Sequence, residues 1–216
     1  MVATNDSQNL FTTDKAGNMK QFSVTKRELV SNYGKPYKGN SFSVMAVNDS
    51  ENIFTWDGKG SLIQWNIANG SNFEYGVLNK GGICSQISTN DSERLFTGDH
   101  HGFLIEVWVK TKKVNSFGKV LQGGIFALAM TNDNEHLFIS NSMGCIVMWS
   151  VLEKRIVNNF GRSHSSMICD MAVTSDNIFL ISRDVESNIK QWKIKDQKLV
   201  HSFGEMTNGP IIKMVL

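Results

Sequence analysis

The chain has 216 residues, of which 41% are hydrophobic and 19% charged, and its formal net charge is +2. That apolar content suffices for a sizeable core, and the charged fraction argues against disorder. A charge so close to neutral does not by itself suggest a nucleic-acid binder. No stretch approaches the roughly twenty apolar residues of a membrane span, and the first residues lack the basic and apolar segments of a signal peptide.

Cysteine usage bears on the compartment. The three cysteines, Cys84, Cys145 and Cys169, leave one unmatched in any disulfide scheme. An odd, widely spaced set favours a reducing compartment, in which buried cysteine acts as a small hydrophobe. We therefore expect an intracellular, cytoplasmic protein.

Three markers recur along the chain in one phase. An aromatic residue followed by glycine returns every 42 or 43 residues, at Tyr33-Gly34, Tyr75-Gly76, Phe117-Gly118, Phe160-Gly161 and Phe203-Gly204. An aliphatic residue followed by phenylalanine occurs at Leu10-Phe11, Ile53-Phe54, Leu95-Phe96, Leu137-Phe138 and Ile178-Phe179. A third column holds Phe22, Trp65, Val107, Trp149 and Trp192. Such periodicity predicts five copies of one unit, near 1–40, 41–82, 83–124, 125–166 and 167–209, with an extra inner strand at 210–216.

Each unit predicts four short strands and no helix. In the second copy these are 42–47, 53–56, 62–67 and 72–75, because β-branched and aromatic runs alternate with turn signals. In the third strand Ile63 and Trp65 share one face, while Leu62 and Gln64 make the other face mixed. A sheet with apolar residues on both faces needs neighbours on both sides. Four-stranded antiparallel blades stacked around an axis, a β-propeller, provide them.

The turns between the second and third strands share a pattern. Four copies place Asp or Asn first and glycine fourth, at Asp14 and Gly17, Asp57 and Gly60, Asp99 and Gly102, and Asn141 and Gly144. The first side chain can accept backbone N–H bonds, and glycine tolerates positive φ. The fifth copy, at 182–186, is longer and lacks the glycine, so we expect its tip to differ. The Asn-Asp-Ser sequons at Asn5, Asn48 and Asn90 share one repeat column, so turn chemistry explains them better than glycosylation.

With these strands and turns, the unit resembles a WD40 repeat, and the resemblance covers the whole chain. The Gly-His dipeptide is missing, and no Trp-Asp dipeptide follows the aromatic column. We therefore expect the family's His–Ser–Trp–Asp hydrogen-bond network to be absent and hydrophobic stacking of blades to carry stability. Both ends align with the innermost strand, which leaves three readings: a fragment of a longer propeller, a five-bladed ring with a redundant strand, or a ring completed by another chain.

Residue patterns for catalysis are missing. The sequence has no G-x-S-x-G elbow, P-loop or H-E-x-x-H motif, and its histidines show no zinc-ligand spacing. The turn aspartates Asp14, Asp57 and Asp99 belong to different blades, so in a propeller they would lie on one face but too far apart to act as a catalytic pair. We therefore expect a protein that is not an enzyme and has no metal or cofactor.

The resemblance implies binding of other proteins or peptides through loops at one rim. The rim residues expected to bind are Lys15, Trp56, Lys59, His100, His101, Ser142 and Arg183. Trp56 occupies a repeat position at which the other copies mostly have small residues. This suggests a binding anchor, although packing is the stronger reading. The leading function is a non-catalytic interaction scaffold. An alternative is filament or nucleic-acid binding through a basic blade face, and a small-molecule-binding or enzymatic propeller ranks third.

Overall fold

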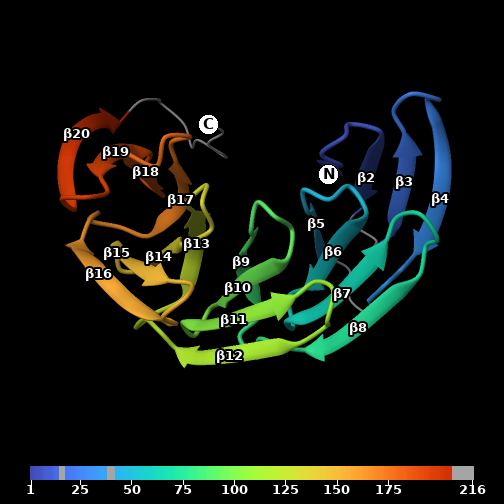
Figure 1. Ribbon diagram of the computed structural model, residues 1–216, viewed down its shortest axis with the longest axis horizontal. Helices are drawn as coiled ribbons and strands as arrows, with labels where there is room; N and C mark the ends of the chain where they lie inside the picture. The colour runs from blue at the N-terminus through green and yellow to red at the C-terminus, as the bar shows by residue number, and fades with distance from the viewer. Residues whose placement is uncertain (15–17, 38–41, 206–216) are drawn as a thin grey trace. The chain divides into compact units, whose positions relative to one another are not determined.

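The structure, a computed structural model, describes residues 1–14, 18–37 and 42–205 (Figure 1). These residues form strands β1 to β20, grouped in five four-stranded antiparallel sheets whose strands lie in chain order. None of the described residues forms a helix, and hence none forms a helix able to cross a bilayer. The prediction of an all-β chain built from five four-stranded repeats is confirmed at this level.

The chain divides into two compact units, Met1–Ile83 and Cys84–Leu216. The first unit contains the first and second sheets. The first sheet comprises β1 (Val2–Ala3), β2 (Asn9–Thr13), β3 (Met19–Ser23) and β4 (Glu28–Gly34). The second sheet comprises β5 (Phe42–Ala46), β6 (Asn52–Asp57), β7 (Ser61–Asn66) and β8 (Asn72–Val77), each close to its predicted range.

The second unit contains the third, fourth and fifth sheets, and the first strand of the third begins at the unit boundary. The third sheet comprises β9 (Ile83–Ser88), β10 (Arg94–Asp99), β11 (Phe103–Trp108) and β12 (Val114–Lys119). The fourth comprises β13 (Ile125–Met130), β14 (His136–Asn141), β15 (Cys145–Ser150) and β16 (Arg155–Arg162). The fifth comprises β17 (Ile168–Val173), β18 (Phe179–Asp184), β19 (Asn188–Lys193) and β20 (Lys198–Glu205). The predicted extra strand at 210–216 lies outside the described residues.

The register of the fifth repeat corrects one sequence marker. Leu180 pairs with Trp192, as Ile53 pairs with Trp65 in the second sheet. The fifth copy of the aliphatic-Phe column is therefore Leu180-Ile181, and Ile178-Phe179 lies two residues too early. The strand pairing defines which residues are equivalent between repeats, and Ile178-Phe179 has the marker sequence without having the equivalent position.

The aromatic-glycine marker is a β-bulge in the fourth strand. In β8, Gly76 has φ 73° and pairs with Leu62, while the next pair joins Ile63 to Glu74, so Tyr75 is the extra residue. The bulge of β4 likewise leaves Tyr33 unpaired in the ladder. A bulge re-aims a side chain. Tyr33 meets Trp65 of the next sheet edge to face, with ring centroids 5.2 Å apart.

Within each unit, adjacent sheets stack through opposite faces. The clusters join the phenylalanine face of one sheet to the tryptophan face of the next. Phe11 and Met19 pack with Ile53, Ile63 and Trp65; Phe96 and Leu104 pack with Leu137, Val147 and Trp149; and Phe138 and Met148 pack with Leu180 and Trp192. The fourth sheet is thus covered on both faces, as its two apolar faces require.

A ladder of asparagines links the turns between first and second strands. The Asn90 amide donates to the Asn132 carbonyl at 3.0 Å in the next sheet, and Asn132 donates in turn to the Thr174 carbonyl at 3.2 Å. The backbone N–H of Asn132 also reaches the Asn177 side chain at 2.8 Å. In the first unit the Asn5 amide donates to the Asn48 carbonyl. The asparagines at this repeat position therefore form hydrogen bonds between neighbouring sheets.

We expect Asn132→Ala to lower the free energy of unfolding by about 1 kcal/mol, because a net hydrogen bond contributes about 0.5–1.5 kcal/mol and alanine cannot donate to the next sheet. Ser175→Ala, at the equivalent turn position of the fifth repeat, is the matched control and should change stability by less than about 0.5 kcal/mol. Urea unfolding curves measure both, and equal losses would contradict a role for the amide.

Candidate functional site

The turns between second and third strands have a common bonding pattern. Asp99 Oδ1 accepts hydrogen bonds from the backbone N–H groups of His101 and Phe103, at 2.9 and 2.8 Å. Asp57 binds its own turn in the same way, and Asn141 does so with its amide oxygen. The side chain of the first residue therefore holds the turn, while the two residues at its tip contribute only backbone.

The fifth turn has the same form, contrary to our expectation of a different tip. Asp184 Oδ1 accepts from the N–H groups of Glu186 and Asn188, at 3.0 and 2.9 Å. Ser187 occupies the glycine position with φ 65°. The turn is thus Asp184–Ser187, with serine accepting the left-handed conformation, and the two-residue shift of the column explains the misreading.

The fourth turn position favours glycine for a second reason besides its positive φ. A Cβ on Gly102 would lie 2.2 Å from the carbonyl oxygen of Leu121, in the connection to the next sheet. That connection is fastened at the same place, because Val120 N–H donates to the Gly102 carbonyl at 2.9 Å. The turns and the inter-sheet connections therefore form one edge. We call the turns Asp99–Gly102, Asn141–Gly144 and Asp184–Ser187 the turn edge of the second unit.

A buried polar chain underlies the turn edge in the fifth sheet. His164 Nδ1 lies 3.0 Å from Asp184 Oδ2, and His164 Nε2 lies 2.7 Å from Ser182 Oγ. Trp192 Nε1 donates to the same serine oxygen at 2.8 Å. The His–Ser–Trp–Asp network that we expected to be absent is present here. We expected no such network because the sequence has no Gly-His dipeptide. His164 follows a serine instead of a glycine, yet the loop that carries it still places the imidazole beside Ser182.

The protonation of this chain follows from burial. Burial lowers the pKa of His164, and the Asp184 carboxylate offsets only part of that effect. Burial opposes ionisation of Asp184, but the bonds from Asn188 and His164 outweigh it and lower the pKa of this carboxyl. A neutral imidazole with its proton on Nδ1 donates to Asp184 and accepts from Ser182, whose oxygen accepts from Trp192. Each polar group of this His–Asp–Ser–Trp network then has a hydrogen-bond partner.

Other sheets keep parts of this arrangement. In the second sheet Trp65 Nε1 donates to Thr55 Oγ1 at 2.9 Å, and the Tyr37 hydroxyl, 3.0 Å from the same atom, stands where the fifth sheet has histidine. In the fourth sheet the buried Trp149 Nε1 has no hydrogen-bond partner. The third has Val107 in the tryptophan column and cannot form the bond.

The predicted binding residues separate into exposed and buried groups. Lys59, His100 and His101 are exposed on turn tips, and Ser142 is half-buried on its tip. Trp56 and Arg183, by contrast, are only 6% and 4% exposed. Both lie within second strands rather than on turns, so neither is exposed at the rim, and the burial of Trp56 agrees with packing, the stronger of its two readings. Lys15 and the turn residue Gly17 lie outside the described residues.

A hollow of about 360 Å³ opens beside Ser142. Its lining comprises Ser142, Met143, Cys145, Arg162 and Ser165. The turn supplies the first two, the start of β15 supplies Cys145, and the end of β16 and the loop after it supply the others. Sequence reasoning missed Arg162 because only the pairing of Cys145 with Arg162 brings it to the turn.

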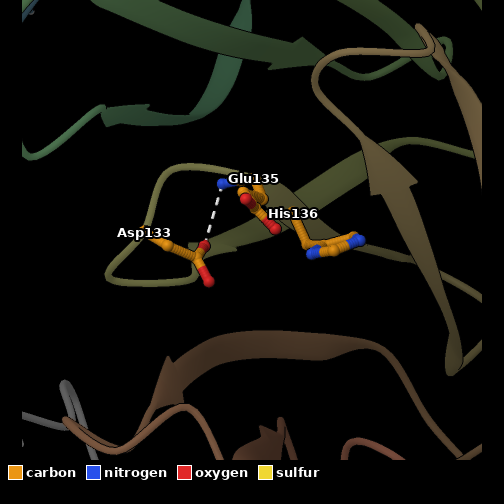
Figure 2. A group of neighbouring side chains, drawn as sticks. All are labelled: Asp133, Glu135 and His136. Atoms are coloured by element: carbon orange, nitrogen blue, oxygen red, sulfur yellow. Dashed lines mark hydrogen bonds between the residues drawn. The ribbon is translucent and has the colours of Figure 1, made fainter.

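Three potential metal ligands gather at the opposite end of the fourth sheet, on the turn between β13 and β14 (Figure 2). Ligand atoms of Asp133, Glu135 and His136 lie within 4.8 Å of one another. Asp133 Oδ1 accepts from Glu135 N–H at 2.9 Å, the dashed line in Figure 2, and from Thr131 Oγ1 at 2.6 Å. Asp91 and Asp176 make the same bonds in their repeats, so turn formation accounts for Asp133.

Comparison with known proteins adds no relative. No protein-family model matches the chain, and no curated protein matches it. Any functional assignment therefore depends on the repeats, their hydrogen bonds and the exposed residues of the turn edge.

The two equivalent tryptophans give a matched pair of substitutions. Trp192→Phe removes the donor to Ser182 Oγ and should lower the free energy of unfolding by about 1–3 kcal/mol. Trp149→Phe makes the same change where the indole N–H has no partner, so its cost should be at least about 1 kcal/mol smaller. Denaturant unfolding measures both, and a larger cost at Trp149 would contradict the role assigned to the Trp192 bond.

The lowered pKa of His164 predicts acid sensitivity. Its folded-state pKa lies below the unfolded value, so its contribution to stability is complete above about pH 6.5 and is lost as the pH falls. We expect the thermal midpoint to drop between pH 8 and pH 5. His164→Gln should lower the midpoint at pH 8 but flatten this dependence. A wild-type pH profile in His164→Gln would refute the assignment.

Proposed function

We propose that the five sheets are blades of a WD-repeat β-propeller and that this propeller is a non-catalytic, intracellular scaffold that binds other proteins or peptides through its turn edge. The five four-stranded antiparallel sheets are the basis for this inference. The circular arrangement of the sheets, the family and the binding role go beyond them.

The buried network supports the family assignment. The network takes one residue from each of four parts of the repeat: His164 from the connection between sheets, Ser182 from the second strand, Trp192 from the third strand and Asp184 from the turn. These are the residue types that the resemblance to WD repeats implies. The stacking of one sheet's phenylalanine face on the next sheet's tryptophan face supports a radial repeat.

The turn edge supports the binding role, and this is the observation that carries the proposal. Structure at each turn depends on its first and fourth residues, which are largely buried. The two tip residues between them are exposed, apart from the half-buried Ser142, and differ from turn to turn: His100 and His101, Ser142 and Met143, Val185 and Glu186. A rigid edge that presents variable side chains is suited to recognising a partner.

Affinity capture from cell extract tests the proposal. A His100→Ala/His101→Ala/Met143→Ala variant should recover at least about tenfold less of the proteins that the wild-type chain captures, because a few anchors carry most interface energy. A Lys110→Ala/Lys113→Ala variant, altered at the opposite end of the third sheet, is the control and should retain them.

Both variants must keep the wild-type thermal midpoint for the comparison to count. Equal capture by the turn-edge variant and the wild type would overturn the binding role of this edge, and so would equal loss in the control. Mass spectrometry with isotope labelling gives the ratio for each captured protein.

A further inference from the structure

The hollow at the end of the fourth sheet has one exposed guanidinium. Arg162 ends β16 opposite Cys145, and its side chain faces solvent. Its Nη2 donates to the Ser165 carbonyl at 3.0 Å. A guanidinium has five N–H donors, so one carbonyl leaves most of its capacity unused. No carboxylate of the described residues forms an ion pair with it.

A second cation strengthens the positive field at the same loop. Lys190 Nζ donates to the Ser163 carbonyl at 2.7 Å and also has no ion-pair partner among the described residues. Asp184, the carboxylate that His164 contacts, is buried and bonded to His164, Asn188 and its own turn. The loop between the fourth and fifth sheets is therefore bonded by two cations, Arg162 and Lys190, that have no ion-pair partner among the described residues.

The rest of the lining adds polar and apolar contacts. Ser142 and Ser165 bring hydroxyl groups, and Met143 is 47% exposed on the turn tip. An exposed methionine is an adaptable apolar contact. The hollow thus combines one guanidinium and two hydroxyls with an apolar rim, a set that matches an anionic side chain beside a hydrophobic one.

We propose that this hollow binds a carboxylate side chain from an acidic segment of a partner protein, with its oxygens on the Arg162 guanidinium and a neighbouring apolar side chain on Met143. The inference rests on the proposed scaffold function and specifies the chemistry of its partner. A guanidinium fork matches the two oxygens of a carboxylate. A phosphoryl group would carry up to two charges, and only one guanidinium lines the hollow.

Fluorescence anisotropy with short labelled peptides tests the proposal. The probe is the peptide SGELEGS, its uncharged counterpart is SGQLQGS, and a phosphoserine version replaces both glutamates. We expect the glutamate peptide to bind more tightly than both others. Arg162→Gln should weaken its binding at least about tenfold, and Arg162→Lys should weaken it by less, because lysine retains the charge but loses the fork.

Arg155→Gln is the matched control. Arg155 lies in the same strand at its other end, is exposed, and pairs with Glu153. Its replacement removes the same charge and should leave peptide binding unchanged. Met143→Glu is a second variant at an exposed position. It puts a competing carboxylate beside Arg162 without disturbing the core and should abolish binding even if Arg162→Gln fails to fold.

Three outcomes would overturn the proposal: equal weakening by Arg155→Gln and Arg162→Gln, equal binding of the glutamine peptide, or tighter Arg162-dependent binding of the phosphoserine peptide. These outcomes leave the scaffold function standing if the turn-edge variant still loses its captured proteins. Failure of that capture experiment as well would remove both.

Discussion

The structure depends on one constraint: each four-stranded sheet has apolar side chains on both faces and cannot bury them alone. The fourth sheet shows the solution, with Trp149 against the third sheet and Phe138 against the fifth. Burial of such side chains contributes about 1.5–3 kcal/mol each. The β-bulges of the fourth strands serve the same contact, because they direct Phe117 and Phe160 onto the tryptophans of the following sheets. Stability in a unit is therefore a property of neighbouring pairs of sheets.

Much of this could be predicted from the sequence, because the markers that repeat are the groups that touch. Tyr33 and Trp65 belong to two separate markers, and the structure brings their rings together. The fifth repeat was misread because Ile178-Phe179 resembles the marker dipeptide, whereas pairing with Trp192 selects Leu180. The turn Asp184–Ser187 was missed in the sequence because serine occupies the position that glycine has in the other repeats. A dipeptide search cannot detect such substitutions, since backbone pairing and φ define these positions.

The candidate site was less predictable because it depends on contacts between distant residues. Position on a turn tip identified Lys59, His100 and His101 as exposed, but Trp56 and Arg183 belong to strands and are buried. His164 and Ser182 are 18 residues apart, and their meeting required the path of the connecting loop. Arg162 reaches Ser142 only through the pairing of β15 with β16. Periodicity locates elements, whereas these sites arise where the connections between elements cross.

The self-contained bonding of the turns has a consequence for how such a chain can change over evolutionary time. Asp99 holds its turn through backbone N–H groups, so the dipeptide between Asp99 and Gly102 contributes no side-chain bond to the turn itself. Substitutions at this dipeptide change the side chains that face the surroundings while Asp99 keeps the hydrogen bonds of the turn, and the ring contact that they alter is that of His100 with Phe126. The same independence makes each tip a grafting point for engineering, where a new dipeptide can be installed one repeat at a time. The side chains on the tips can therefore be changed by evolution or by design while the sheets and the turn hydrogen bonds remain constant.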